Sequence, residues 1–123
     1  MLKKPIEGSR PLGEVILHLL RSIEYYLRGL AENNWVSLPY TLEDYSSASS
    51  IKALAKDVFE RTKLYIEKLA SVDLSRVVDT FNRPATLSEI LLELIEHSIH
   101  HRGQITVYYR LLGIKPVHIP YII

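Results

Sequence analysis

Three stretches of the chain repeat apolar residues at the spacing of an amphipathic α-helix, and this pattern constrains the fold more than any other feature. In each stretch an apolar residue recurs every three or four positions, so the apolar side chains share one helical face. A strand would instead alternate apolar and polar residues. We therefore expect three helices, at about residues 11–32, 50–70 and 86–112.

Residues at the ends of these segments are typical of helix termini. Ser9 is expected as the cap of the first helix, with Pro11 as its first residue. Thr86 followed by Glu89 has the spacing of a capping box, and it precedes the longest apolar pattern. Gly113 follows that pattern, where a helix commonly ends in a left-handed residue.

The connections are long enough to carry structure of their own. Residues 35–50 form a long loop, of a length that is often functional or mobile. Residues 77–81 alternate weakly, which indicates a short strand or hairpin with a turn at 82–84. The tail, residues 114–123, is rich in β-branched residues and is expected to pack along the bundle as an extended segment.

Three amphipathic helices indicate an all-α, up-and-down helical bundle. The chain has 123 residues, of which 47% are hydrophobic, enough to build the core of one domain spanning residues 1–123. Bundles of this kind usually contain four helices. We therefore expect a homodimer, in which the partner chain supplies the missing packing.

Composition excludes several classes of protein. The chain has 15 basic and 14 acidic residues, whereas nucleic-acid binders usually show a basic excess. It has no cysteine, which excludes disulfides, thiolate metal sites and cysteine nucleophiles. It has neither an apolar run of the ~20 residues that a membrane span requires nor an apolar signal region before Gly8. We expect a cytoplasmic protein that does not bind membranes.

Two histidines of the third segment share one helical face. His97 and His101 lie four residues apart, so their side chains leave the helix one turn apart and can bind one metal ion. His101 falls within the apolar stripe and His97 beside it. A buried imidazole needs a partner. That partner is either a metal ion or a hydrogen-bonding group, such as a tyrosine hydroxyl or a backbone carbonyl.

His18 lies at the edge of the apolar stripe of the first segment. If the first and third helices pack together, it completes a three-histidine cluster with one open position, the arrangement of catalytic zinc sites. Polar residues near these positions could accept hydrogen bonds from the N–H groups of the ligand imidazoles, although solvation at the surface is the simpler role for the carboxylates. These candidates are Glu24, Glu93, Glu96 and Gln104.

Gly103 is a glycine within the third helical segment. Glycine at such a position costs about 1 kcal/mol relative to alanine. It therefore indicates a close approach to the helix backbone, either by another helix or by a functional group.

The residues around the paired histidines resemble a known signature. The run His97-xxx-His101-Arg102-Gly103-Gln104 precedes an apolar helix that ends at Leu111-Leu112-Gly113, and Gly13–Leu20 surrounds the upstream histidine. This pattern is similar to that of the DinB-like (damage-inducible, YfiT-like) superfamily, and the similarity covers about residues 10 to 115. The resemblance implies a four-helix bundle with His18, His97 and His101 as metal ligands. This chain departs from it by lacking the family's first helix.

The resemblance also implies a chemistry. The family's metals are zinc, nickel or other divalent ions, and its members include transferases and isomerases that use bacillithiol, mycothiol or glutathione. We therefore expect a metal-dependent enzyme acting on a small-molecule substrate. It would be an S-transferase with a low-molecular-weight thiol cosubstrate, or a hydrolase. The catalytic residues remain unassigned.

The alternative is a non-catalytic helical assembly module that a metal ion stabilises. In that case a fourth protein ligand would close the site. His118, or His100 from a second chain, could supply it.

Overall fold

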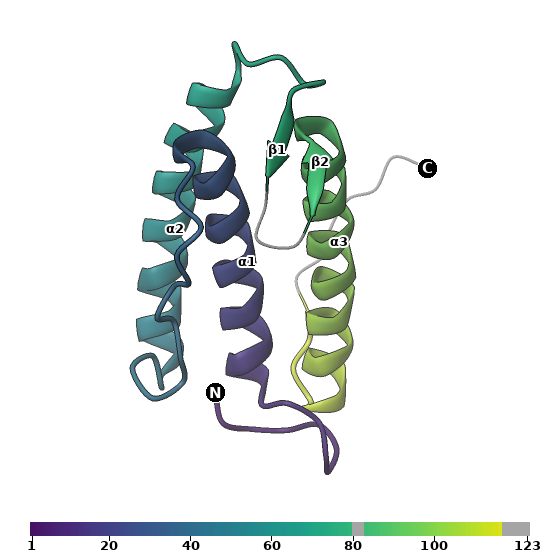
Figure 1. Ribbon diagram of the computed structural model, residues 1–123. Coiled ribbons are helices and arrows are strands. Elements are labelled where there is room, and N and C mark those ends of the chain that lie inside the picture. Colours follow the sequence, from purple (N-terminus) through teal and green to yellow (C-terminus); the bar gives the residue numbers. More distant parts are fainter. Residues whose placement is uncertain (80–82, 117–123) are drawn as a thin grey trace.

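The computed structural model describes residues 1–79 and 83–116, and its elements are three helices and two short strands (Figure 1). The helices are α1 (Leu12–Glu32), α2 (Ala48–Leu69) and α3 (Leu87–Leu111), and the strands are β1 (Val77–Asp79) and β2 (Pro84–Thr86). The predicted all-α fold is confirmed, and each helix terminus lies within two residues of its expected position. Across the described residues, no helix is both long enough and apolar enough to cross a membrane.

The start of α1 differs from the prediction. Pro11 is the cap residue itself and makes no side-chain capping bond. Ser9 does not cap the helix, because its hydroxyl donates to the carbonyl oxygen of Ile6 at 2.6 Å. The end of α1 is set by Asn33, which adopts the left-handed conformation with φ 55° and donates its N–H to the carbonyl of Gly29. Asparagine tolerates this conformation better than most residues.

Side-chain caps begin the other two helices. α2 starts two residues earlier than expected because Ser47 and Ser50 form a reciprocal capping box. The Thr86 hydroxyl accepts a hydrogen bond from the N–H of Glu89 at 3.2 Å, which is one half of the capping box that the sequence predicts; the Glu89 carboxylate lies 3.5 Å from Arg83. Each cap satisfies a backbone donor that the first turn of a helix leaves without an internal partner.

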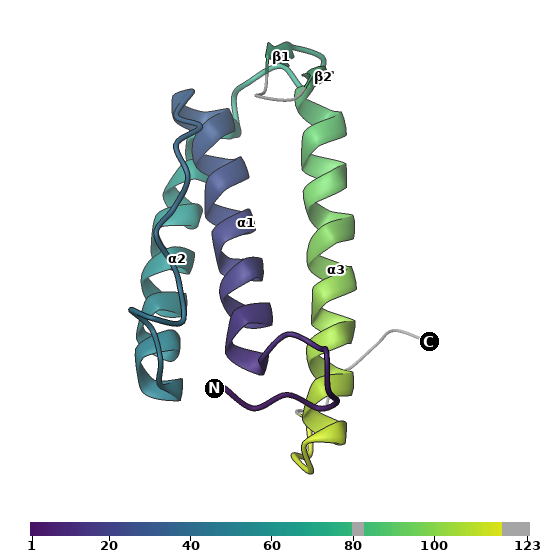
Figure 2. The ribbon, with the colours of Figure 1, turned by 60° about the horizontal axis from the view of Figure 1, so that its bottom comes forward.

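α1 and α2 run parallel, so the expected up-and-down order is wrong for this pair. Leu17 and Leu20 pack against the first half of α2, and Leu30, near the other end of α1, lies in one cluster with Leu69 at the end of α2. Figure 2 shows the loop between the two helices running back along α1. A 15-residue loop spans about 50 Å when extended, more than the about 32 Å length of α1, so it can return to the end at which α1 begins.

The returning loop, residues 33–47, is attached to α1 rather than free. The Trp35 ring lies so close to Gly29 that a Cβ added there would be 2.3 Å from it. Arg28 donates from its guanidinium to the carbonyl oxygens of Asn34 and Val36. These contacts hold the loop against one face of α1.

The two strands form a hairpin before α3, as predicted, but Pro84 begins β2 and does not belong to the turn expected at 82–84. β1 and β2 are antiparallel, with Val77 opposite Thr86 and Asp79 opposite Pro84. Residues 80–82 of the predicted hairpin lie outside the described residues. Most of the tail expected to pack along the bundle, residues 117–123 with His118, also lies outside them.

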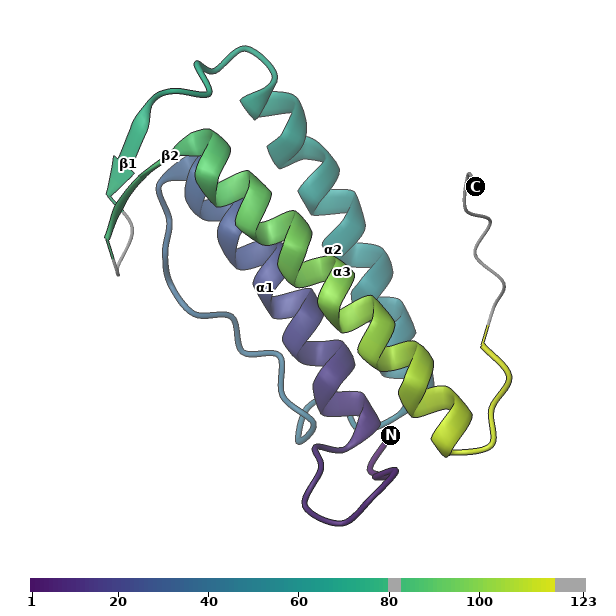
Figure 3. The ribbon, with the colours of Figure 1, turned by 90° about the vertical axis from the view of Figure 1, so that its right-hand side faces the viewer.

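α1 and α3 pack antiparallel, and their apolar contact is divided into two clusters (Figure 3). At one end of the interface Leu12 and Val15 pack against Tyr108. At the other end Leu27 and Leu30 of α1 pack in the cluster that contains the first two turns of α3. Between the two clusters lie three histidines.

Candidate metal centre

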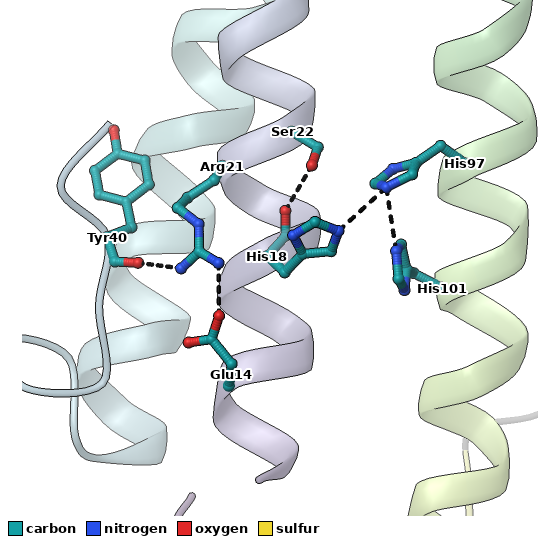
Figure 4. A network of polar contacts seen from close by, with 7 residues as sticks. All are labelled: Glu14, His18, Arg21, Ser22, Tyr40, His97 and His101. Carbon is teal, nitrogen blue, oxygen red and sulfur yellow. Dashed lines mark hydrogen bonds and ion pairs between the residues drawn. The ribbon is translucent and has the colours of Figure 1, made fainter. Parts of the chain in front are cut away.

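The three sequence-predicted histidines converge between α1 and α3. His18 points from α1 toward α3, and His97 and His101 point from α3 toward α1 (Figure 4). The Nε2 atom of His97 lies 3.2 Å from Nε2 of His18 and 3.1 Å from Nε2 of His101. The antiparallel packing of the two helices therefore brings together residues 79 positions apart in the chain.

The two nitrogen distances at His97 are close to those around a tetrahedral metal ion. Two nitrogens bound to zinc at about 2.0–2.1 Å are about 3.3–3.4 Å apart in that geometry. One ligand atom from each histidine can be chosen so that all three lie within 4.8 Å of one another. The rings meet edge-on, with interplanar angles from 66° to 81°, so their nitrogen lone pairs can point to a common centre.

Gln104 holds one of the rings. Its side-chain oxygen lies 2.7 Å from Nδ1 of His101. The amide oxygen can only accept, so Nδ1 carries the proton and Nε2 presents a lone pair to the cluster. An oriented imidazole of this kind is common behind metal-binding histidines.

The second ring nitrogen of His97 has no comparable hydrogen bond among the described residues. Its Nδ1 atom is buried and has no hydrogen-bond partner among the described residues. Its Nε2 atom lies within hydrogen-bond distance of both other rings, although a neutral imidazole carries a single N–H. Three neutral imidazoles therefore cannot satisfy one another, whereas a cation bound to three lone pairs would remove the conflict.

The surroundings of His18 and His97 also suppress protonation of these two imidazoles. Burial, together with repulsion from the His101 and His97 rings, lowers the pKa of His18 from 6.5 to about 4. Burial and the neighbouring His101 and His100 lower the pKa of His97 in the same direction. Neutral imidazole is the form that binds metals.

A cavity of about 610 Å³ borders His18 on the side of the returning loop. Its wall combines the aromatic rings of Tyr25, Tyr26 and Trp35 with the Arg21 guanidinium. Arg21 is held in place by Glu14, at 2.6 Å, and by the carbonyl oxygen of Tyr40. A cavity with apolar walls and a few fixed polar groups is typical of small-molecule sites.

The structure places the three carboxylate candidates away from the histidines. Glu24 is buried and accepts hydrogen bonds from Tyr40 and Arg61. Glu93 is exposed and pairs with Arg83, and Glu96 is exposed on α3.

The Glu24–Arg61–Tyr40 network was not expected from the sequence. The signal that could have revealed it is the position of Glu24 on the apolar face of α1, four residues after Leu20 and three before Leu27.

No fourth ligand completes the cluster within the described residues. The only His, Cys, Asp or Glu side chains grouped there are His18, His97 and His101. His100 is exposed, and although its ring centroid lies 4.9 Å from that of His101, it is not part of the group. The arrangement thus has three protein ligands.

A helical bundle with three converging histidines defines a class of small proteins, and comparisons with known proteins identify the family. The chain matches the family model of the DinB family over residues 1–122, and it belongs to that family. It is 31% identical over 113 residues to YjoA of Bacillus subtilis (strain 168), an uncharacterized protein, covering 89% of this chain and 72% of YjoA.

Solved structures agree with this placement. The fold is similar to that of the DinB-like protein YjoA from Bacillus subtilis, with a TM-score of 0.73 and 29% identity, over 97% of this chain and 78% of that one. It is also similar to a DinB-like protein from Bacillus cereus ATCC 10987, with a TM-score of 0.69 and 30% identity, over 94% and 77% of the two chains.

Proposed function

We propose that this protein is a metal-dependent enzyme in which His18, His97 and His101 bind one divalent metal ion, zinc or nickel. The observation that carries the proposal is the convergence of the three imidazoles, in which Nε2 of His97 lies 3.2 Å from that of His18 and 3.1 Å from that of His101, close to the spacing of tetrahedral ligands. Burial keeps the His18 imidazole neutral and ready to bind, because its pKa lies at about 4. The proton of His101 on Nδ1, held by Gln104, leaves Nε2 free as a ligand.

Three protein ligands leave a fourth position for a reactant. A bound divalent metal lowers the pKa of a coordinated water or thiol, which supplies a nucleophile at neutral pH. The chain has no cysteine, so a thiol nucleophile has to come from a low-molecular-weight cosubstrate. We favour thiol transfer or hydrolysis on a small molecule that enters the cavity beside His18. The aromatic rings there would exclude water from one side of a bound substrate, and the Arg21 guanidinium, held by Glu14, would offer its remaining N–H groups as hydrogen-bond donors.

Metal content tests the site. Protein purified without added metal is analysed for elements beside the His18→Ala, His97→Ala and His101→Ala variants. We expect near-stoichiometric metal in the unmodified protein and a loss in all three variants. His100→Ala is the matched control, because His100 is exposed on the same helix and outside the cluster. Full metal retention by His18→Ala would contradict a site shared between α1 and α3.

Gln104→Ala probes the supporting hydrogen bond. Loss of such a contact typically weakens metal binding by about 10- to 100-fold, so the variant should bind metal with reduced affinity and unchanged stoichiometry. A competition titration with a chelator measures the difference. Affinity equal to that of the unmodified protein would contradict the role given to the 2.7 Å contact with His101.

Cobalt substitution distinguishes an enzyme from a closed structural site. The visible spectrum of bound cobalt(II) reports its ligands, and an open position allows glutathione or another small thiol to change that spectrum. We expect such a change in the cobalt-loaded protein. A spectrum insensitive to thiols and to small anions would favour the non-catalytic assembly module instead.

A further inference from the structure

The side of α3 away from α1 carries an unbroken row of exposed residues four positions apart, which turns around the helix by about 40° at each step and is centred on Gly103. Ile95, Ile99, Val107 and Leu111 are each more than half exposed, at 53–57%, and Gly103 occupies the middle position of the row. Rows with this spacing are the ridges by which helices pack against one another. In Figure 3 α3 lies nearest the viewer, and no other described helix or strand crosses it.

Gly103 has no packing role within the subunit. A Cβ added there would meet nothing within 4 Å in the described structure. Glycine is nevertheless the weakest helix former after proline. The distance between packed helices depends on the side chains at their contact, so a glycine allows the closest crossing at this point of the row.

Two unpaired charges lie at equal distances from this glycine. Glu96 precedes Gly103 by seven positions and Arg110 follows it by seven. Both side chains are exposed, and neither makes an ion pair with any residue that the structure describes. The face therefore carries opposite charges on the two sides of its centre.

This arrangement is complementary to itself when one helix is reversed. If two α3 helices cross antiparallel at Gly103, Glu96 matches Arg110 of the partner subunit, and Arg110 matches the partner's Glu96. Ile99 likewise matches the partner's Val107, and Ile95 the partner's Leu111. A two-fold dimer requires a surface that is complementary to itself in this way. A partner of another kind would not explain why the pattern is symmetric about one residue.

We propose that this face of α3 is the interface of a homodimer in which two antiparallel α3 helices cross at Gly103. The interface lies on the side of α3 opposite the buried residues that face α1, such as Leu94 and His101. It is therefore independent of metal binding, and either proposal can fail without the other.

Charge reversal tests the register of the interface. Glu96→Arg and Arg110→Glu each place like charges together at two symmetric positions, whereas the double variant restores opposite charges. We expect sedimentation velocity over a concentration series to show a dimer for the unmodified protein. Each single reversal should raise the dimer dissociation constant by at least about tenfold, and the double variant should return to within about threefold of the original.

Two further variants complete the design. Glu60→Arg, an exposed glutamate of α2, is the matched control and should leave the dimer unchanged. Gly103→Leu should give a monomer with unchanged helical circular dichroism, because leucine prevents the close crossing. A monomeric unmodified protein, a double variant that fails to recover, or a dimer that Gly103→Leu leaves intact would each overturn the proposal.

Discussion

Replacement of Glu24 by alanine should destabilise the fold without affecting the histidine cluster. Glu24 is 3% exposed. Its carboxylate accepts from the Tyr40 hydroxyl at 2.7 Å and from the Arg61 Nη2 and Nε at 2.8 and 3.1 Å. These contacts join α1 to α2 and to the returning loop, so one side chain connects three parts of the fold.

The size of the destabilisation follows from the donors on Tyr40 and Arg61 that Glu24→Ala leaves without an acceptor. Hydrogen bonds to charged groups contribute about 1.5–3 kcal/mol each. Breaking a fully buried ion pair costs about 3–5 kcal/mol, but the Arg61 side chain is 40% exposed and can be rehydrated. We therefore expect Glu24→Ala to lower the free energy of unfolding by about 3 kcal/mol, which corresponds to a fall in Tm of about 10 °C for a domain of this size. Glu24→Gln, which keeps an acceptor for Tyr40, should cost about half as much.

Urea denaturation and calorimetry measure the effect, with metal content determined on the same samples. Glu32→Ala is the matched control on α1, because Glu32 makes a surface ion pair with Lys68 and such pairs contribute at most about 1 kcal/mol. Metal content should be unchanged, since Glu24 contacts none of the three histidines. A loss of metal in a stably folded Glu24→Ala variant would refute this reasoning, as would a destabilisation no larger than that of Glu32→Ala.

Two further predictions concern the returning loop and the histidines. Gly29→Ala places a methyl group 2.3 Å from the Trp35 ring and should lower the free energy of unfolding, measured by thermal unfolding, by about 1–3 kcal/mol. In a Trp35→Ala background the same change should be neutral or stabilising. An equal loss of stability in both backgrounds would exclude the clash. In the metal-free protein the lowered pKa of His18 means that the folded state binds fewer protons than the unfolded chain between pH 6.5 and about 4. The free energy of unfolding should therefore fall as the pH is lowered through this range, with a smaller dependence in His18→Ala; identical pH profiles for the two proteins would contradict the lowered pKa.

The sequence predicts the helices, the hairpin and the pairing of His97 with His101 because each depends on local spacing. The positions of His97 and His101 on one face follow from helix geometry alone. His18 joins them only if its helix packs against the third helix, which the sequence does not specify. The Thr86 cap and the left-handed Gly113 are equally local features.

The direction of α2 and the partners of Glu24 could not be predicted in this way. A loop as long as residues 33–47 allows α2 to run in either direction, so helical periodicity does not decide between them. Glu24, Tyr40 and Arg61 come from three separate elements, and they meet only because α1 and α2 are parallel. The three carboxylate candidates are close in sequence to the histidines or share a helix with them, but this proximity does not specify which way a side chain points.

The central position of α1 has a consequence for local unfolding. α1 packs extensively against both other helices, whereas α2 and α3 barely touch. α3 is thus held to the rest of the chain mainly through its contact with α1, and the middle of this contact is polar rather than apolar. Regions with few buried apolar contacts open most readily. Amide hydrogens in the central turns of α3 should accordingly exchange with solvent sooner than those of α1. A ligand bound between the three histidines should slow this exchange, because it would hold α1 and α3 together at the polar centre of their contact.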